Sequence, residues 1–263
     1  MTAPPFLSIV IPAYNEQDNF AAKALAKVTR YLKPRKWSYE VIIVDDGSTD
    51  GSIENIQKFV AQNPHWRLIK NPHLGKAQTV ATGIMEATGE NVLFTDFDQA
   101  TPLSEVEKLL PFIKKNYHIV IGSREVQGSK REKEPWYRHF MGRGFNFIVS
   151  LVALRGIHDT QCGFKLFKTA VAKDLFGRLV VYSQKPEKAA FTGAFDVEVL
   201  YLAQKQKLRL AEVPVHWKHI KTSRVNPVKD SLRMFVDLLR IRLTDVLGGY
   251  QSPFDRSQSP DGR

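Results

Sequence analysis

Short apolar runs alternate with amphipathic stretches along the first part of the chain. The runs predict strands at Leu7–Pro12, which is rich in β-branched residues, and at Tyr39–Val44, Trp66–Lys70 and Asn91–Thr95. Apolar residues at helical spacing predict helices between them, over Asp18–Leu32, Ser52–Asn63 and Lys76–Thr88. This alternation favours an α/β fold with a Rossmann-like, mainly parallel sheet and helices on both faces.

The second half of the chain predicts one more strand at Tyr117–Gly122, and Asp159–Phe167 is interpreted as a turn. Val228–Leu247 has the pattern of a basic amphipathic helix. Its apolar positions are Leu232, Phe235, Val236, Leu239, Leu243 and Val246. Two interpretations remain open, a helix that lies on an anionic membrane and a helix that closes the core or a dimer interface.

Composition restricts the class of protein. With 43% hydrophobic and 25% charged residues, the 263-residue chain is typical of a folded soluble protein. Its formal net charge of +11 favours an anionic partner, which leaves nucleic acid, anionic lipid and phosphorylated substrates open. A single cysteine, Cys162, excludes an internal disulfide and a thiolate metal site.

We expect a cytoplasmic protein without a transmembrane helix. The N-terminal residues lack the basic region of a signal peptide. The most apolar later stretch, Phe145–Leu154, is only about ten residues long, whereas a span needs roughly 20.

Three polar clusters follow predicted strands, at Tyr14–Glu16, Asp45–Ser48 and Asp96–Gln99. Carboxyl ends of parallel strands are where ligands bind in open α/β sheets. The chain has neither a Gly-rich dinucleotide fingerprint nor a Walker lysine motif, so a cation would have to hold phosphates. Asp96 and Asp98 can point to one side of an extended segment and suit Mg²⁺ or Mn²⁺. The alternative is that such acidic turns only cap helices.

These motifs carry a resemblance to a known family. Val10–Glu16, Val44–Gly51 and the Asp-x-Asp at Asp96 and Asp98 resemble the nucleotide-binding half of inverting, nucleotide-sugar-dependent glycosyltransferases of family 2, which have the GT-A fold. Later segments are similar to dolichyl-phosphate β-glucosyltransferases, and match polyprenyl-phosphate mannosyltransferases less closely. Those segments are Gly122–Arg124, Asp159–Phe167 and Phe195–Ala203.

The resemblance implies roles for residues of the donor side. Nucleotide-sugar binding is implied for Pro12, Tyr14, Glu16, Asp46, Lys76 and Asp96. Asp98 is implied as the direct metal ligand, with Asp96 on the ribose or a metal-bound water. The chain departs from the family in the bulky Phe97 and in Ala100, where mannosyltransferases carry glutamine, and we expect Gln99 to substitute as a metal ligand.

The implied acceptor is a lipid-linked phosphate, which is already nucleophilic at neutral pH and needs no general base. Arg124 is implied to face the diphosphate. The charged stretch Glu125–Glu134 is interpreted as a mobile loop that closes on the acceptor phosphate through Arg131 or a neighbouring lysine, Lys130 or Lys133. The alternative is a solvated loop whose charges cancel. Arg138 and Arg143 are similar candidates.

Asp196 is expected to begin a helix and to orient the sugar hydroxyls, with simple helix capping as the alternative. If the acceptor were a hydroxyl group, Asp196 or Glu198 would instead serve as the general base. The set of catalytic candidates is therefore Asp98, Arg124, Arg131 and Asp196.

We expect a GT-A domain over residues 1–220, with a nucleotide-sugar half (1–122) and an acceptor half (123–220). A basic amphipathic membrane-associating segment (221–250) and a disordered tail (251–263) follow. The resemblance implies metal-dependent inverting transfer of glucose from UDP-glucose to a polyprenyl phosphate, at the cytoplasmic face of a membrane, with a membrane-protein recruiter as a further possible partner. The alternatives are a GDP-mannose-dependent mannosyltransferase and a family 2 enzyme with a hydroxyl acceptor. Nucleic-acid binding is disfavoured, since no RNA-binding motif or zinc spacing is present.

Overall fold

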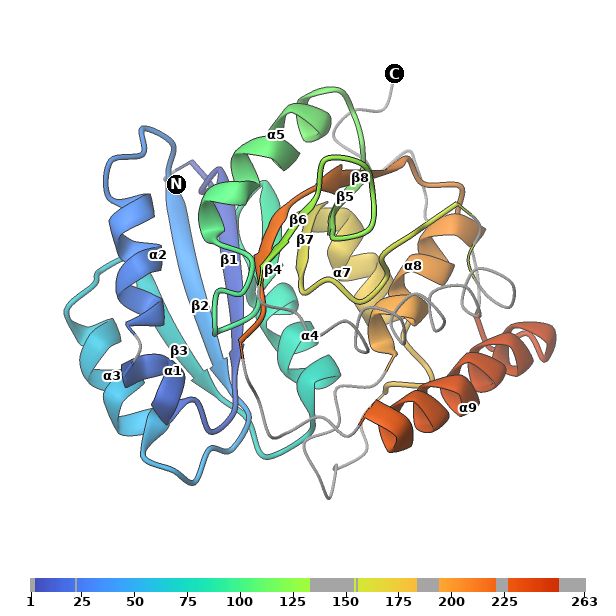
Figure 1. Ribbon diagram of the computed structural model, residues 1–263, viewed down its shortest axis with the longest axis horizontal. Coiled ribbons are helices and arrows are strands. Elements are labelled where there is room, and N and C mark those ends of the chain that lie inside the picture. Colours follow the sequence, from blue (N-terminus) through green and yellow to red (C-terminus); the bar gives the residue numbers. More distant parts are fainter. Residues whose placement is uncertain are drawn as a thin grey trace.

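The computed structural model describes residues 3–21, 23–132, 154, 156–183, 194–220 and 227–250, with side chains from residue 232 onward in the last range. The strands of the main sheet are β1 (Leu7–Ala13), β2 (Tyr39–Asp45), β3 (Trp66–Lys70), β4 (Asn91–Thr95), β5 (Ile119–Ser123), β7 (Phe164–Lys168) and β8 (Leu210–Pro214). They form one seven-stranded sheet in the order β3-β2-β1-β4-β7-β5-β8 (Figure 1). The predicted α/β architecture with a mainly parallel sheet is confirmed.

The four N-terminal strands lie where the sequence predicts them. β1 pairs in parallel with β2 and with β4, and β2 pairs in parallel with β3. Ala13, at the end of β1, is in register with Asp45, at the end of β2. The loops that follow β1 and β2 therefore leave the sheet side by side, as expected for a ligand site.

β7 is an antiparallel strand between β4 and β5. The interpretation of Asp159–Phe167 as a turn is therefore wrong for its last four residues. Lys165 interrupts the apolar run there, and its ammonium group is accommodated by a partner on a distant segment. Part of the stretch Glu125–Glu134, interpreted from the sequence as a mobile loop, is instead a strand, β6 (Lys130–Glu132), which pairs in parallel with β9 (His216–Lys218).

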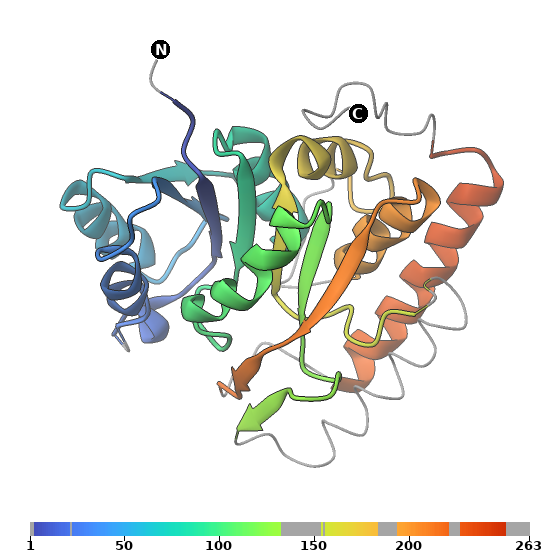
Figure 2. The same ribbon diagram turned by 90° about the horizontal axis from the view of Figure 1, so that it is seen from above.

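Helices cover both faces of the sheet (Figures 1 and 2). They are α1 (Gln17–Ala21), α2 (Ala24–Leu32), α3 (Ser52–Ala61), α4 (Lys76–Glu86), α5 (Val106–Lys114), α7 (Thr169–Gly177), α8 (Phe195–Lys205) and α9 (Pro227–Val246), with a short 3-10 helix, η1 (Leu103–Glu105). Residues of α2, α3 and α5 pack with one face of the sheet, and residues of α4, α7, α8 and α9 pack with the other. The single helix predicted over Asp18–Leu32 is two helices, since Lys23 takes a left-handed conformation with φ 59°.

The C-terminal helix α9 lies beside α8 at one end of the molecule (Figure 1). Leu238 and Ile241 are fully buried in the core that α8 also lines. The predicted apolar stripe lies elsewhere on the helix and is exposed to solvent. Among the described residues, no helix has the length and apolar content that crossing a membrane requires.

Candidate active site

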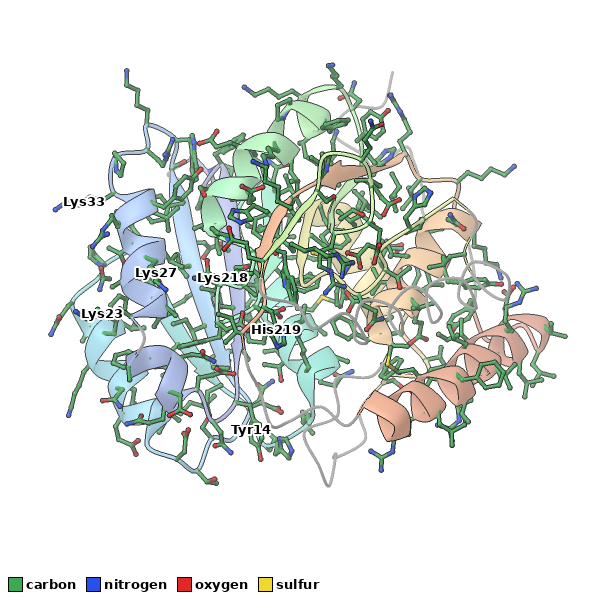
Figure 3. The ribbon with its side chains drawn as sticks, viewed as in Figure 1. Tyr14, Lys23, Lys27, Lys33, Lys218 and His219 are labelled. Carbon is green, nitrogen blue, oxygen red and sulfur yellow. The ribbon has the colours of Figure 1, made fainter. Side chains whose placement is uncertain are left out.

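The loops after β1 and β2 are joined by hydrogen bonds to each other. The Asn15 and Glu16 amides donate to the hydroxyls of Ser48 and Ser52, at 2.9 and 2.7 Å. In return, the Thr49 amide donates to Oδ1 of Asn15 at 2.8 Å. Asn15 has φ 53°, a left-handed conformation that asparagine tolerates better than most residues. These hydrogen bonds hold Tyr14 and Glu16 in place at the carboxyl edge of the sheet. Figure 3 labels Tyr14 there.

Asp46 is buried, and its carboxylate organises the turn that precedes α4. Its oxygens accept hydrogen bonds from the amides of Leu74 and Gly75, at 2.9 and 3.0 Å. His73 Nδ1 lies 2.8 Å from Asp46 Oδ2, and the His73 ring stacks on Tyr14. Sequence reasoning missed His73, because a lone histidine in a loop has no pattern that distinguishes it. The predicted contacts of Tyr14, Glu16 and Asp46 with a nucleotide stay predictions, and so does that of Pro12, a buried residue of β1.

Asp96 and Asp98 follow β4, with Phe97 turned the other way into the core that α2 and α5 line. This alternation explains how the bulky Phe97 is accommodated. Lys76, the first residue of α4, places its Nζ 2.6 Å from Asp96 Oδ1. Burial alone would lower the pKa of Lys76, but the Asp96 carboxylate outweighs it, and the pKa is raised. The Asp96 carboxylate therefore explains why a lysine stands at the start of α4, where a positive charge is otherwise unfavourable.

Asp98 is a mostly buried carboxylate close to other acidic groups. Burial, and then the charge of Asp96, raise the pKa of Asp98 to about 6. Its Oδ1 accepts the Ala100 amide at 2.9 Å. Gln99 directs its amide nitrogen to the Asp96 carbonyl, 2.8 Å away, and has φ 55°. Its predicted role as a metal ligand is not tested by these contacts.

The donor set at this edge suits a hard divalent cation. The negative charge of Asp96 contributes to the raised pKa of Asp98, so the two carboxylates repel each other, and a cation between them removes that repulsion. Within the ranges given above, three or more His, Cys, Asp or Glu side chains do not gather into a complete cation site. Mg²⁺ and Mn²⁺ sites commonly complete their coordination with substrate phosphates and water. Asp96 and Asp98 therefore fit the ligands that the protein itself would supply to such a site.

Asp196 occupies the first turn of α8 and is paired with a buried lysine. Lys165 Nζ lies 2.6 Å from Asp196 Oδ1, and both side chains are almost fully buried. Burial raises the pKa of Asp196, against the opposing effect of Lys165 and, more weakly, of Lys76. Asp196 therefore begins a helix, as predicted, on the side of the sheet where Lys76 and Asp96 lie. Sequence reasoning missed Lys165, whose partner is 31 residues away.

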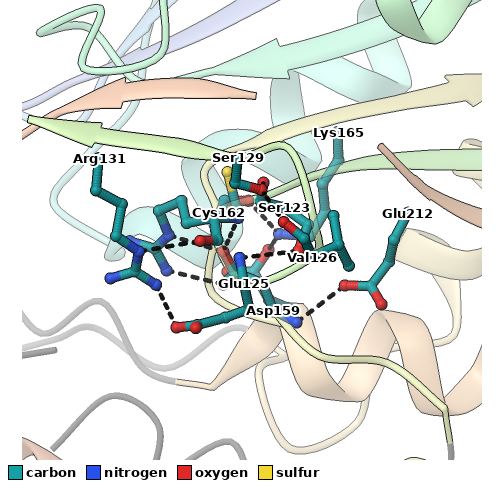
Figure 4. Close-up of polar contacts among 11 residues, drawn as sticks. Ser123, Glu125, Val126, Ser129, Arg131, Asp159, Cys162, Lys165 and Glu212 are labelled. Atoms are coloured by element: carbon teal, nitrogen blue, oxygen red, sulfur yellow. Dashed lines mark hydrogen bonds and ion pairs between the residues drawn. The ribbon is translucent and has the colours of Figure 1, made fainter. Parts of the chain in front are cut away.

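Arg124 and Arg131 both have acidic partners within the protein. Figure 4 labels Arg131 and the two partners, Glu125 and Asp159. Nε and Nη2 of Arg124 donate to the two carboxylate oxygens of Asp159, at 2.7 and 2.8 Å. Arg131 donates to Glu125 and, at 3.0 Å, to the Arg124 carbonyl oxygen. The proposed contacts of these arginines with phosphates remain predictions. Lys133, Arg138 and Arg143 lie outside the described residues.

Glu198 is fully buried, and its carboxylate binds the segment that follows α7. It accepts the amides of Val180, Val181 and Tyr182, at 2.8, 2.9 and 3.1 Å, and the hydroxyl of Tyr250 at 2.8 Å. A carboxylate so occupied is not placed to act as a general base. Cys162 is equally buried, and burial raises its pKa to about 12, so it is a thiol and not a nucleophile.

The mainly parallel sheet with helices on both faces gives this protein a GT-A fold. A solved structure of glucosyl-3-phosphoglycerate synthase from Mycobacterium tuberculosis, in complex with Mn²⁺, UDP and glucosyl-3-phosphoglycerate, matches 95% of this chain and 82% of that chain, with a TM-score of 0.59. At 15% identity, this likeness shows the fold alone.

The sequence profile of Glycosyl transferase family 2 matches residues 8–176, and the chain belongs to that family. A dolichyl-phosphate β-glucosyltransferase of Dictyostelium discoideum is 37% identical over 92% of this chain and 76% of its own length. One from Homo sapiens is 34% identical over 93% of this chain and 77% of its own length. The resemblance drawn from the motifs is confirmed.

Proposed function

We propose that this chain transfers glucose from UDP-glucose to a polyprenyl phosphate of the dolichyl type, with inversion at the anomeric carbon. The observation that carries the proposal is the half-buried pair Asp96 and Asp98, with Lys76 beside Asp96, at the carboxyl edge of a family 2 chain. Its relatives are named dolichyl-phosphate β-glucosyltransferases, and a fold neighbour holds Mn²⁺ and UDP. We infer the same kinds of donor and acceptor here.

The chemistry needs few groups from the protein. A phosphate oxygen of the acceptor attacks the anomeric carbon, the bond to the UDP oxygen breaks, and UDP leaves with that electron pair. Mg²⁺ or Mn²⁺ on Asp96 and Asp98 would supply positive charge to the diphosphate. Tyr14, Glu16 and Asp46 are proposed to fix the nucleotide, Lys76 to balance phosphate charge, and Asp196 to orient the sugar.

A donor screen tests the reaction. The protein is incubated with UDP-glucose, UDP-galactose, UDP-N-acetylglucosamine or GDP-mannose, with Mg²⁺ or Mn²⁺, with and without a short polyprenyl phosphate in detergent. We expect UDP release only with UDP-glucose, metal and lipid phosphate together. Preferred turnover of GDP-mannose, or turnover that a soluble hydroxyl acceptor stimulates, would contradict the proposal.

We propose that α9 places the enzyme on an anionic membrane, where a polyprenyl phosphate resides. Among the described residues, seven of the nine exposed large hydrophobic side chains belong to this helix and the turn after it. They are Leu232, Phe235, Val236, Leu239, Leu243, Val246 and Leu247. Most lie along one stripe of the helix, and concentrated apolar exposure of this kind marks an interaction surface.

The net charge of +11 favours an anionic lipid surface over a neutral one. The proposed division is a catalytic unit over residues 1–220 and a membrane-associating segment over 221–250, acting at the cytoplasmic face of a membrane. Vesicles that contain phosphatidylserine should co-sediment with the protein. The double variant Leu243→Ser and Val246→Ser should lose this binding. The control Met85→Ser removes another exposed apolar side chain, on α4, which is 41% exposed, and should keep the binding.

An apolar stripe can also bind a second copy of the chain. Size-exclusion chromatography distinguishes a membrane from a second copy of the chain as the partner of this stripe. The membrane proposal would be contradicted if the wild type formed a dimer that Leu243→Ser dissociates and did not bind vesicles. Vesicle binding by a monomer, lost in the same variant, would support it.

A further inference from the structure

One short segment, Cys162–Lys165, contacts two acidic side chains that belong to separate parts of the candidate site. The segment leads into β7, between β4 and β5. Gly163 lies against Asp96, which follows β4, and Lys165 binds Asp196, which lies in the first turn of α8. The two carboxylates are 100 residues apart in sequence, and this segment provides a common support for both.

Gly163 leaves no room for a side chain beside Asp96. A Cβ atom at position 163 would lie 2.0 Å from Asp96 Oδ2 and 2.5 Å from its Cγ. Such distances are far shorter than the roughly 3.5–4.0 Å of normal nonbonded contact. The backbone of Gly163 does not have a positive φ, so the close approach alone, and not the backbone conformation, requires glycine here.

The same glycine also fixes the Asp96 backbone. Its carbonyl oxygen accepts the Asp96 amide at 3.2 Å. On the other side, Lys76 Nζ lies 2.6 Å from Asp96 Oδ1. The carboxylate of Asp96 is therefore held between the Gly163 backbone and the Lys76 ammonium group, and its direction depends on both.

Lys165 performs the corresponding task for Asp196. Its Nζ donates to the Cys162 carbonyl oxygen at 2.5 Å and to Asp196 Oδ1 at 2.6 Å, and lies 5.2 Å from the centre of the Phe94 ring. The side chain is 1% exposed. A buried ammonium group without a partner is strongly unfavourable, so the ion pair with Asp196 fixes both groups. It thereby joins β7 to the first turn of α8.

We propose that Gly163 and Lys165 are positioning residues of the active site: Gly163 sets the direction of the Asp96 carboxylate toward the metal and diphosphate, and Lys165 sets that of Asp196 toward the sugar. The proposal rests on the proposed function for what the two carboxylates bind. The supporting contacts themselves do not depend on the identity of the donor or the acceptor.

A double-mutant cycle tests the contact between Gly163 and Asp96 without any ligand. Gly163→Ala should destabilise the wild-type protein in urea, because its methyl group displaces the Asp96 carboxylate. In the Asp96→Ala background the clash is absent, so the same change should have little effect. Equal effects of Gly163→Ala in both backgrounds would overturn the assignment of Gly163, whatever reaction the enzyme catalyses.

Calorimetry with Mn²⁺ and UDP then tests the functional consequence. We expect Gly163→Ala to weaken the affinity for Mn²⁺ and UDP by roughly 10- to 100-fold, as changes behind metal ligands usually do. The control is Gly177→Ala at the end of α7, where the nearest neighbour is the flexible methyl group of Met85 at 3.3 Å. It should bind as the wild type does. Unchanged binding by Gly163→Ala would contradict the proposal, whereas a wild type that binds neither ligand would contradict the proposed function instead.

For Lys165 the informative quantity is the extra affinity that the glucose unit adds, measured as the ratio of the dissociation constants of UDP and UDP-glucose. Lys165→Met should reduce this ratio toward one while leaving UDP binding nearly unchanged, because Asp196 is assigned to the sugar. Lys168→Met, at the partly exposed end of the same strand, serves as the matched control. A ratio unaltered by Lys165→Met would overturn the assignment of Lys165.

If Lys165→Met proves too unstable to assay, Lys165→Met combined with Asp196→Asn removes both charges of the pair. The double variant should be more stable than Lys165→Met alone, since it no longer buries an unpaired carboxylate. A double variant that is less stable by the sum of the two single changes would show that the two side chains act independently and would contradict the proposal.

Discussion

The Tyr14 ring lies stacked on the His73 imidazole, with 4.4 Å between the ring centroids and 13° between the planes. His73 in turn places Nδ1 2.8 Å from Asp46 Oδ2. Three loops of the carboxyl edge, after β1, after β2 and before α4, are thereby connected through three side chains. This connection orients the Tyr14 ring before any nucleotide arrives.

An oriented aromatic ring at this edge predicts a specific effect of Tyr14 on nucleotide binding. Tyr14→Ala should weaken UDP binding by about 1–3 kcal/mol, the usual range for stacking of a base on an aromatic ring. Tyr14→Phe keeps the ring and serves as the control, with binding close to that of the wild type. Titration calorimetry with UDP and Mn²⁺ measures both, and equal affinities of Tyr14→Ala and the wild type would refute a role of the ring in binding.

We expect substitution of Glu198 to lower the stability of the protein without changing the pH dependence of catalysis. Its carboxylate accepts three consecutive backbone amides, of Val180, Val181 and Tyr182. In Glu198→Gln, an amide NH₂ replaces one accepting oxygen, and the buried donors it leaves unpaired should cost about 1–3 kcal/mol of unfolding free energy. Urea denaturation measures this cost.

The corresponding kinetic measurement separates structure from catalysis. The folded fraction of Glu198→Gln should keep the pH profile of kcat, because the carboxylate is occupied by backbone amides and does not accept the proton of an acceptor. If one limb of that profile disappeared, Glu198 would have to be a general base, and the hydroxyl-acceptor alternative would be favoured.

The strands and helices of the nucleotide-binding half were predictable because their signals are local. β3 (Trp66–Lys70) and β4 (Asn91–Thr95) have the predicted bounds, since clear turn residues stand on either side of each strand. β7 was not predictable in this way. Lys165 stands in the middle of its apolar run, and a buried lysine is acceptable there because its charge is paired with that of the distant Asp196.

The residues of the candidate site also divide into those with a local sequence signal and those without one. Asp96, Asp98 and Lys76 follow from motifs that sit directly after a strand or at a helix start. The contacts of Gly163 and His73 depend instead on how the loops approach one another in space. A glycine required by close approach looks in sequence like any other glycine, so only the structure distinguishes it.

The ion pair between Arg124 and Asp159 should make the protein less stable in acid. Burial alone would raise the pKa of Asp159, but the charge and hydrogen bonds of Arg124 outweigh it and hold the pKa below its usual range. The stabilisation that this pair contributes is therefore fully present above the unfolded-state pKa of about 3.9 and is lost as the pH falls through the lower folded-state value.

The matching variant is Asp159→Asn, which leaves the Arg124 guanidinium without its charged partner. Removal of one member of a buried pair typically costs about 3–5 kcal/mol. We expect the difference in unfolding free energy between wild type and variant to be constant from pH 8 to about pH 5 and to shrink in stronger acid. A difference that grew as the pH fell would have the wrong sign for this pair.

We expect Gly83→Ala to destabilise the protein, although alanine favours helix formation more than glycine does. It lies inside α4, where a Cβ atom would come within 2.3 Å of Val10 Cγ1 and 3.1 Å of Val44 Cγ2. Alanine gains about 1 kcal/mol of helix propensity over glycine, whereas overpacking a close-packed core costs about 1–3 kcal/mol and occasionally more. The packing cost should be the larger, because both valines are fully buried and have no room to retreat.

Denaturation of Gly83→Ala, alone and combined with Val10→Ala, distinguishes packing from propensity. The single variant should be less stable than the wild type. In the Val10→Ala background the nearest clashing methyl group is gone, so Gly83→Ala should become neutral or stabilising. If Gly83→Ala stabilised the protein in both backgrounds, α4 would not approach β1 as closely as the 2.3 Å separation requires.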